Sequence, residues 1–510
     1  MHKRLVNLDI KDRNLFARCA IICKDRPDVN IKEAVGKFEF TVVPRSMFAP
    51  DGTMLHCSTK SNLLHILEEM KDASMTTECT PAEHKVCVVD GMAEVQALDK
   101  PDWITNCGHL AEHFANRILN KYSDSQEIHL IFDRYDIPSS LKAATRVKRQ
   151  GNSDPIYYRI TDSTHITKVP LKRLISHTKT KKELAAYLAK KTLEYAEIQG
   201  KQIVVAWGSE CQATHKDVSH LQSNHEEADT KIILHAVDAS SSGAKEVCIH
   251  SPDTDVLVLA IRRIQNMCDN TFFVTGRPPN KRSIKLKPIA EAIGPVKTAA
   301  LPAFHAITGS DITGSFSGKG KLACWKAFED ADVSVTDALA RLGTDALPDD
   351  EVKTGIEKFV CQVYQPKTNI TTVQELRWLL FRKKQAQSDR LPPTRAALHQ
   401  AILRAHYQML VWNNDIIPNP ELPSPEGYGW AMENDQWVPV MTSLQPAPKE
   451  VLELVKCACL KDRCSTNRCK CRKAGLRCTD LCSCCDNDDC NNQEDETDLE
   501  GSDSESETDD

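Results

Sequence analysis

Three strand-like runs, two that end in aspartate and a third followed by an acidic turn, constrain the fold more than any other feature of the sequence. The runs are KVCVVD at 85–90, EIHLIFD at 127–133 and EVCIHSPDTD at 246–255, and the last leads into an apolar, helix-like segment. Strands that alternate with helical patterns predict βα units. We therefore expect an α/β fold with a parallel sheet flanked by helices.

Further acids lie where strands are expected to end or helices to begin. Because the carboxyl ends of parallel strands share one edge of a sheet, we expect these side chains to converge there. Crowded carboxylates repel one another unless cations neutralise them, and all-oxygen sites suit Mg²⁺ or Mn²⁺. Two such ions about 4 Å apart would clamp a phosphodiester. The acids are Asp90, Asp133, Glu226, Glu227, Asp229, Asp253, Asp255 and Asp311.

Each acid taken alone has a simpler interpretation. A single aspartate after a strand is usually a turn residue or a helix cap. Ser223 and Glu226 have the spacing of a capping box, which predicts a structural role for Glu226. The order of five acidic motifs, rather than any one of them, favours a metal site.

That order resembles the acidic motifs of flap endonuclease-type 5′ nucleases of the PIN superfamily. The resemblance covers about 85–330 and implies a PIN-like sheet. It also implies a nuclease that hydrolyses phosphodiester bonds of DNA, with RNA as the other candidate substrate, using two Mg²⁺ or Mn²⁺ ions. The implied metal ligands are Asp90, Asp133, Glu227, Asp229, Asp253, Asp255 and Asp311.

The resemblance also implies residues that contact the nucleic acid. Lys142 and Arg149 match a lysine and an arginine that face the scissile phosphate, and their spacing is about two helical turns. Gly318-Lys319-Gly320-Lys321 stands where the family has a glycine turn that grips duplex phosphates. The interval 142–191 holds 13 Lys and Arg against three acids, which favours a nucleic-acid surface over a merely solvated helix pair.

The chain departs from the family pattern before and after these motifs. About 85 residues precede Asp90, and Arg134 rather than glycine follows Asp133. The alternative function is therefore a non-enzymatic DNA-binding regulator with an inactive PIN-like scaffold.

Ten of the 21 cysteines lie between Cys457 and Cys490, and their spacing resembles a tesmin-like CXC zinc domain. Nine thiolates satisfy three tetrahedral Zn²⁺ ions only if three of them bridge. Cys485 is then spare or exchanges with Cys490. Eight basic residues against one acid in 456–477 favour DNA binding over a zinc-scavenging role, and Arg468 suits a narrow minor groove. The expected zinc ligands are Cys457, Cys459, Cys464, Cys469, Cys471, Cys478, Cys482, Cys484 and Cys490.

Charge and composition indicate a nuclear protein in a reducing compartment. The net charge is -6, but the last 18 residues hold ten acids, so the rest of the chain is net +4. We expect this tail to be disordered and to meet a basic protein partner. The opening residues carry scattered charges, and no run of 18 apolar residues occurs, so we expect neither secretion nor membrane insertion.

The expected domain organisation has five parts, and the pairing of nuclease and CXC domains resembles uncharacterised animal proteins of mobile-element origin. Seven prolines in 418–448 predict a connector without regular structure. The parts are an N-terminal extension of unknown role at 1–80, the nuclease domain at 81–345, a helical segment and Pro-rich connector at 346–450, the CXC domain at 451–492 and the acidic tail at 493–510.

Overall fold

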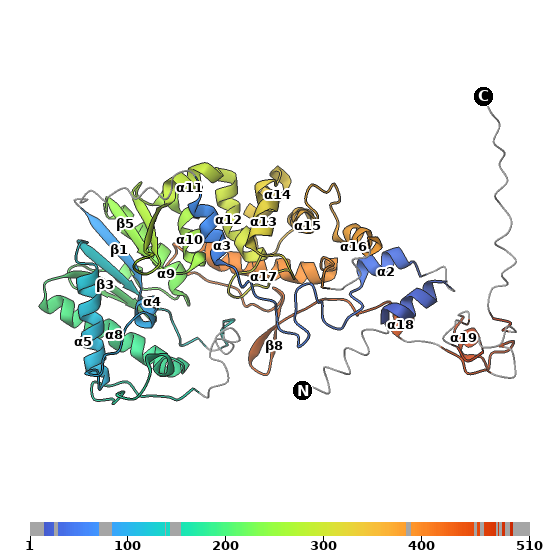
Figure 1. The fold of residues 1–510 in the computed structure, drawn as a ribbon, viewed down its shortest axis with the longest axis horizontal. Coiled ribbons are helices and arrows are strands. Elements are labelled where there is room, and N and C mark those ends of the chain that lie inside the picture. Colours follow the sequence, from blue (N-terminus) through green and yellow to red (C-terminus); the bar gives the residue numbers. More distant parts are fainter. Residues whose placement is uncertain are drawn as a thin grey trace, which may run out of the picture. The chain divides into compact units, whose positions relative to one another are not determined.

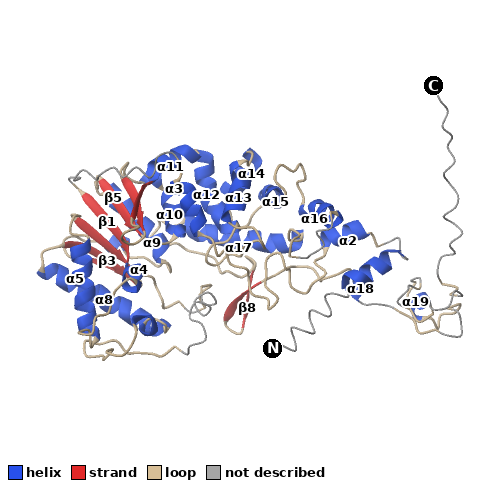
Figure 2. Cartoon of the chain, viewed as in Figure 1, coloured by secondary structure: helices blue, strands red, loops and turns tan. Residues whose placement is uncertain are grey.

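The structure of the chain, a computed structural model, divides into two compact units (Figures 1 and 2). One unit holds 54–371 and 399–440, and the other holds 1–53, 372–398 and 441–510. No helix among the described residues is long and apolar enough to cross a membrane. The structure describes residues 15–24, 29–70, 84–137, 139–142, 155–383, 389–452, 456–459, 464–475, 478, 482–484 and 490–492.

A seven-stranded sheet forms the centre of the first unit, in the order β4-β3-β2-β1-β5-β6-β7. The five inner strands are parallel, and β4 and β7 pair antiparallel at the two edges. The predicted α/β fold with a parallel sheet is thus confirmed. The strands are β1 (Lys85–Asp90), β2 (Glu127–Ile131), β3 (Gln202–Trp207), β4 (Glu210–Ala213), β5 (Glu246–His250), β6 (Thr271–Thr275) and β7 (Arg282–Lys285).

Helices cover both faces of this sheet, as Figure 1 shows. The face that carries Cys87 and Val89 packs against α4 (Gly91–Gln96), α5 (Cys107–Lys121) and α8 (Thr178–Ile198). The opposite face packs against α9 (Ala228–Ser241), which in turn contacts α10 (Thr254–Arg262). Most residues of both helices are buried, and in α9 these include the polar Asp229, Lys231 and His235.

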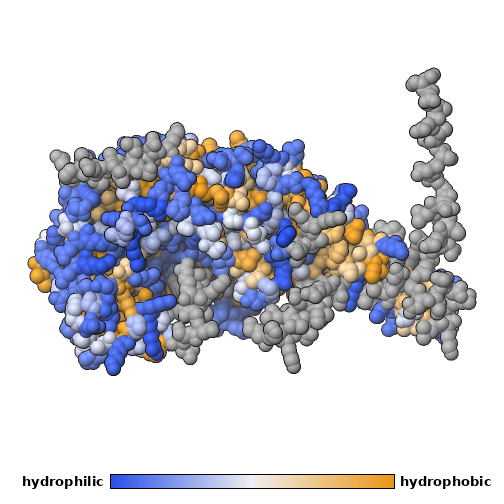
Figure 3. Space-filling view, viewed as in Figure 1, coloured by the Kyte–Doolittle hydropathy of each residue, from blue (hydrophilic) through white to orange (hydrophobic). Residues whose placement is uncertain are grey.

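The remaining helices of this unit extend the fold beyond the sheet. The surface over the sheet is largely hydrophilic in the view of Figure 3. The helices are α3 (Ser61–Glu68), α7 (Leu171–Leu174), α11 (Leu286–Ile293), α12 (Pro295–Ile307), α13 (Lys321–Glu329), α14 (Val333–Ala340), α15 (Asp350–Tyr364) and most of α17 (Arg395–Asn413), with short 3₁₀ turns at Ser219–Leu221 and Ile264–Asn266.

The Pro-rich stretch contains regular structure, so the prediction of an irregular connector is wrong. β8 (Trp430–Glu433) pairs antiparallel with β9 (Gln436–Pro439). Asn434 and Asp435 make the turn with φ values of 48° and 59°, the left-handed pair that a tight hairpin requires. The prolines flank this hairpin or end it, where no ladder donor is needed.

The second unit has a small core of its own. Residues 15–24 are helical, and Phe16 makes edge-to-face contacts with Phe40 and Phe381. Val35 and Val451 also belong to this core. The helices here are α2 (Ile31–Lys37), α16 (Val373–Arg382), α18 (Lys449–Leu452) and α19 (Lys470–Lys473). The predicted acidic tail, 493–510, lies outside the described residues.

The candidate metal centre and the cysteine cluster

The order of the strands reverses between β1 and β5, and the seven predicted carboxylates gather at this end of the sheet. In open parallel sheets, the crevice at such a switch point is where ligands bind. Asp90 ends β1 and Asp133 follows β2. Glu227 and Asp229 open α9, Asp253 and Asp255 open α10, and Asp311 follows α12. Loop and helix-start positions thus bring together acids separated by up to 221 positions in the sequence.

Three of these acids also cap helices, as the simpler interpretation of each motif predicts. Asp90 Oδ1 accepts a hydrogen bond from Ala93 N at 2.9 Å. Asp133 Oδ1 accepts from Ala228 N at 2.8 Å, at the start of α9. Asp253 Oδ1 accepts from the amide of Asp255 at 3.0 Å. A carboxylate has about four lone-pair directions, so a cap leaves it able to bind a cation as well.

The predicted capping box of Ser223 and Glu226 is wrong. Ser223 Oγ accepts from His225 N at 3.2 Å, and α9 begins later, at Ala228. Glu226 instead accepts a hydrogen bond from Ser140 Oγ, and that same oxygen accepts from Lys142 N at 3.1 Å. The first amide of α9, that of Ala228, donates to Asp133 instead. Glu226 therefore fixes the segment that carries Lys142.

The ammonium group of Lys142 lies inside the acidic cluster. Its Nζ is 3.0 Å from Glu227, 3.3 Å from Asp311 and 3.9 Å from Asp229. Lys142 occupies a turn rather than a helix, and Arg149, its predicted partner, lies outside the described residues. Lys142 thus pairs with three carboxylates of the cluster.

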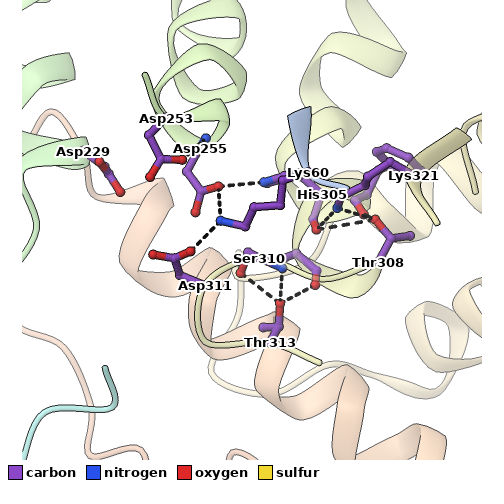
Figure 4. Close-up of polar contacts among 12 residues, drawn as sticks. Lys60, Asp229, Asp253, Asp255, His305, Thr308, Ser310, Asp311, Thr313 and Lys321 are labelled. Carbon is purple, nitrogen blue, oxygen red and sulfur yellow. Dashed lines mark hydrogen bonds and ion pairs between the residues drawn. The ribbon is translucent and has the colours of Figure 1, made fainter. Parts of the chain in front are cut away.

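A second lysine, Lys60, enters the cluster from the segment in which the sequence indicated no chemistry. Its Nζ lies 2.9 Å from Asp255 Oδ1 and 2.6 Å from Asp311 Oδ1 (Figure 4). One sequence signal was present, since a lysine at the N-cap of a helix opposes the positive end of the helix dipole. Lys60 is that residue in α3, and its side chain makes no capping hydrogen bond.

The carboxylates divide into two groups by their pKa. Burial raises the pKa of Glu227 to about 7, although Lys142 opposes the shift. Burial and Asp255 raise the pKa of Asp253 to about 6, and burial and Asp253 also raise the pKa of Asp229. Burial and Asp133 raise the pKa of Asp90 to about 7. In these four carboxylates, burial and neighbouring acids outweigh the nearby positive charge.

The other carboxylates are already neutralised by nearby cations. Burial alone would raise the pKa of Asp255, but Lys60 and His305 lower it well below the usual value. Burial alone would also raise the pKa of Asp311, but Lys142 and Lys60 lower it below its usual value. Lys181, the Ala228 amide and Tyr135 overcome burial and lower the pKa of Asp133.

The donor set fits a hard divalent cation. Glu227, Asp229 and Asp253 offer only oxygen atoms, which Mg²⁺ and Mn²⁺ prefer. Their raised pKa values express the free energy that a cation would recover by restoring the ionised forms. The region of Asp255 and Asp311, by contrast, already holds the ammonium of Lys60.

The predicted glycine turn is present, but Lys321 does not face solvent. Gly318 adopts a φ of +67° with open space around its Cα, and Lys319 Nζ lies 4.9 Å from the centre of the Tyr364 ring. Gly320 precedes α13. Lys321 is fully buried, and its Nζ donates to His305 O at 2.8 Å and Thr308 Oγ1 at 2.7 Å. Lys321 therefore joins α12 to the start of α13 through its buried ammonium group.

A cavity of about 360 Å³ lies beside Lys142 and Glu227. Ser140, Ile312, Tyr407 and Trp437 are among the side chains that line it. Aromatic and aliphatic walls next to charged groups suit a planar ring joined to an anion.

In the second unit, the nine predicted cysteines form one cluster. Cys457 Sγ lies 3.6 Å from Cys464, 3.8 Å from Cys478 and 3.4 Å from Cys484. The Sγ atoms of Cys471 and Cys482 are 3.6 Å apart, and so are those of Cys484 and Cys490. Four zinc–sulfur bonds of ~2.3 Å at tetrahedral angles place sulfurs ~3.8 Å apart, so this spacing fits zinc.

Shared thiols connect the zinc-sized groups of this cluster. Four overlapping sets of four cysteines have all their Sγ atoms within 4.8 Å of one another, and Cys457 and Cys478 each belong to three sets. Overlap of this kind is what bridging thiolates produce. Cys485 lies outside the described residues, so its exchange with Cys490 stays a prediction. Arg468 is exposed beside the cluster, with its amide donating to Thr466 Oγ1 at 3.4 Å.

No family model matches the sequence, and no curated protein matches it. Solved structures are similar to parts of the chain at low identity and low TM-score. The bacteriophage T5 D15 protein, crystallised with metal ions, is 12% identical, with a TM-score of 0.31, over 64% of this chain and 99% of its own. The catalytic core of Rad2 in complex with a DNA substrate is also 12% identical, with a TM-score of 0.33, over 72% of this chain and 87% of its own.

Proposed function

We propose that the chain is a divalent-metal-dependent nuclease that hydrolyses phosphodiester bonds of DNA, with RNA as the other candidate substrate. The observation that carries this proposal is the convergence of carboxylates at one end of the sheet, where Lys142 Nζ lies within 3.9 Å of Glu227, Asp229 and Asp311. Buried carboxylates held close together without enough positive charge are costly for stability alone, and a metal-dependent reaction explains their presence.

The seven carboxylates would hold Mg²⁺ or Mn²⁺, two ions in the full centre. Bound ions would activate water and neutralise charge developing on the phosphate. Glu227, Asp229 and Asp253 would bind the first ion, because among the described residues none of them contacts Lys60 and only Lys142 lies within 4 Å of Glu227 and Asp229. Asp90 and Asp133 would orient its water molecules from the ends of β1 and β2.

Lys142 and Arg149 would stabilise the reacting phosphate. Lys142 already lies 3.0 Å from Glu227, so a phosphate next to this carboxylate comes within its reach. Gly318, Lys319 and Gly320 would hold the duplex through backbone amides and one ammonium group.

The cysteine cluster would bind three Zn²⁺ ions as a CXC module and tether the nuclease to DNA in the nucleus. The sulfur spacing and the overlap of the thiol groups support this, as does the basic composition of 456–477. Arg468 would enter a minor groove. The acidic tail would bind a basic protein partner.

One observation favours the alternative, a DNA-binding regulator with an inactive scaffold. Lys60 and Lys142 neutralise part of the acidic centre without any metal. A scaffold that has lost catalysis would keep such internal ion pairs and lose metal affinity.

Cleavage assays on the full-length protein separate the two functions. Labelled 5′ flaps, hairpins, single strands and RNA duplexes would be incubated with Mg²⁺, Mn²⁺ or EDTA. We expect metal-dependent cleavage of at least one substrate, and its loss in the double variant Asp229→Asn, Asp253→Asn. Asp350→Asn is the matched control, because Asp350 is almost fully exposed at the start of α15. Equal cleavage by the double variant and the wild type would contradict the nuclease assignment.

A further inference from the structure

The most unexpected group in the molecule is the ammonium of Lys60. Lys60 lies 195 residues from Asp255 and 251 from Asp311, yet it contacts both carboxylates at hydrogen-bonding distance. Its side chain is 20% exposed, whereas those of Asp255 and Asp311 are 1% and 8% exposed. Figure 4 shows Lys60 between these two acids, with Asp229 and Asp253 to one side.

The fold holds Lys60 at this place from two directions. The segment before it runs beside the loop that carries Asp311, where Ser315 N donates to Leu55 O at 2.8 Å. Gly309 has a φ of +108°, and a Cβ there would lie 3.0 Å from Cys57 Cβ, so only glycine permits this approach. After Lys60, α3 packs against α10 and α13. The lysine is thus built into the centre rather than folded over it by a surface loop.

Lys60 accounts for the unequal charge of the two parts of the centre. Asp255 and Asp311 are both paired with its ammonium, and His305 Nε2 adds a contact to Asp255 at 2.8 Å. Asp229 and Asp253 make no ion pair with Lys60 among the described contacts, and Asp229 lies 3.9 Å from Lys142 Nζ. A divalent ion therefore meets one ammonium group at 3.9 Å in the Asp229–Asp253 part, whereas in the Asp255–Asp311 part Lys60 lies within 2.9 Å of both carboxylates.

We infer that Lys60 is a tethered cation that occupies the second ion position, so that the centre binds one divalent ion tightly and a second only by displacing Lys60. This inference rests on the proposed metal centre. A lysine ammonium carries one positive charge, whereas a divalent ion carries two. Because the ammonium is attached to the chain, it competes with the second ion for Asp255 and Asp311 at a fixed effective concentration. The protein would then cleave at low metal concentration slowly, and faster once the second ion enters.

Direct metal binding tests the inference without relying on catalysis. Free Mn²⁺ would be measured by electron paramagnetic resonance during titration of the full-length, zinc-loaded protein. We expect one tight Mn²⁺ site in the wild type and a second site at least about tenfold weaker. Lys60→Met should tighten the second site to within a few-fold of the first. Lys60→Arg should keep the wild-type pattern because it keeps the charge.

Control variants separate the effect of the Lys60 charge from a general effect of losing a lysine or of misfolding. Lys326→Met removes an exposed lysine from α13, the helix against which α3 packs, and should change neither site. If Lys60→Met fails to fold, Lys60→Gln replaces it, since an amide still hydrogen-bonds both acids without charge. Two equal Mn²⁺ sites in the wild type would overturn the role of Lys60 and leave the nuclease proposal standing. No Mn²⁺ binding by any variant would overturn both.

The metal dependence of cleavage supplies a second measurement. The Mn²⁺ concentration for half-maximal rate should fall at least about tenfold in Lys60→Met if the second ion limits the reaction. A lower maximal rate with an unchanged Mn²⁺ titration would mean that Lys60 acts on the substrate, and that result would also overturn the inference.

Discussion

His305 Nε2 lies 2.8 Å from Asp255 Oδ1, and both side chains are fully enclosed. Burial and Lys321 lower the pKa of His305 to about 4, so the imidazole is neutral and donates from Nε2 to an ionised Asp255. Asp255 therefore has two internal donors, Lys60 and His305. Asp253, two residues earlier, accepts only backbone amides among the described contacts. Two acids of one motif are thus held in opposite electrostatic states.

This contrast predicts opposite effects of two similar substitutions on the metal-free protein. Asp253→Asn should raise the free energy of unfolding by roughly 1–3 kcal/mol, because it removes a repelled charge and asparagine caps helices well. Asp255→Asn should lower it by roughly 3 kcal/mol, because it breaks a buried ion pair. Urea unfolding at pH 7.5 in the presence of a weak chelator that spares zinc measures both. Changes of the same sign would contradict this account of the centre.

The second prediction concerns Lys142. If its ammonium stabilises charge that develops on the phosphate, Lys142→Ala should lower kcat by about 10²-fold or more and change KM little. Lys182→Ala is the control, since Lys182 is half exposed on α8 and lies 3.7 Å from Asp136. Steady-state cleavage at saturating Mn²⁺ gives both constants. A change confined to KM would limit Lys142 to substrate tracking.

The sheet and the gathering of the acids could be predicted from sequence because both depend on local patterns. Apolar runs that end in Asp90 and Asp133 identify strands and also their carboxyl ends. Strands β3, β4, β6 and β7 were not predicted, and the four-residue edge strands β4 and β7 carry little periodic signal. The β8–β9 hairpin was missed because its prolines outweighed the Asn434-Asp435 turn signal.

Contacts between distant segments could not be predicted in this way. Nothing in the sequence around Lys60 indicates Asp311 as its partner, because that contact depends on how α3 packs. The burial of Lys321 could not be predicted either, because a lysine in a glycine-rich turn is usually solvated. Here the packing of α12 on α13 encloses its side chain. Pattern identifies the acids of the centre, whereas tertiary packing decides which cations reach them.

A third prediction uses His235, which is buried against His129 with 2.9 Å between their Nδ1 atoms. Burial, His129 and Lys231 lower the pKa of His235 well below its usual value of 6.5. The unfolded chain therefore binds a proton there that the folded chain does not. Stability is complete above pH 6.5 and falls as the pH drops below it, by about 1.4 kcal/mol per pH unit for this group.

The substitution His235→Asn should remove this part of the pH dependence. Asparagine can still hydrogen-bond His129, so the difference in unfolding free energy between wild type and variant should shrink from pH 7.5 to pH 5. His220→Asn serves as the control, because His220 is exposed and pairs with Asp238 at 2.8 Å. Parallel pH profiles for wild type and His235→Asn would show that His235 is protonated in the folded protein.

The fourth prediction concerns zinc. The purified full-length protein should hold close to three Zn²⁺ per chain, because nine thiolates satisfy three tetrahedra only by bridging. Cys457→Ser should lower the zinc content by at least one ion, since Cys457 belongs to three of the four overlapping groups. Cys268→Ser, in the sheet unit, should not change it. Elemental analysis gives the ratio, and two ions per wild-type chain would exclude the bridged cluster.

The last prediction is that the zinc-loaded cysteine region supplies the salt-sensitive part of DNA binding. If about six of its eight basic residues contact phosphate, log K for duplex binding should fall steeply with log salt while zinc is bound. Removal of the zinc should make this slope less steep by about 5. Arg468 is exposed, and in a narrow minor groove it would read A·T-rich shape. Arg468→Ala should therefore cost more affinity on A·T-rich than on G·C-rich duplex, as measured by fluorescence anisotropy at several salt concentrations. Lys470→Ala, an exposed neighbour in α19, should lose affinity evenly on both duplexes if it contacts only phosphate. An even loss for Arg468→Ala as well would make Arg468 a phosphate contact, and the CXC module would then bind DNA without regard to groove width.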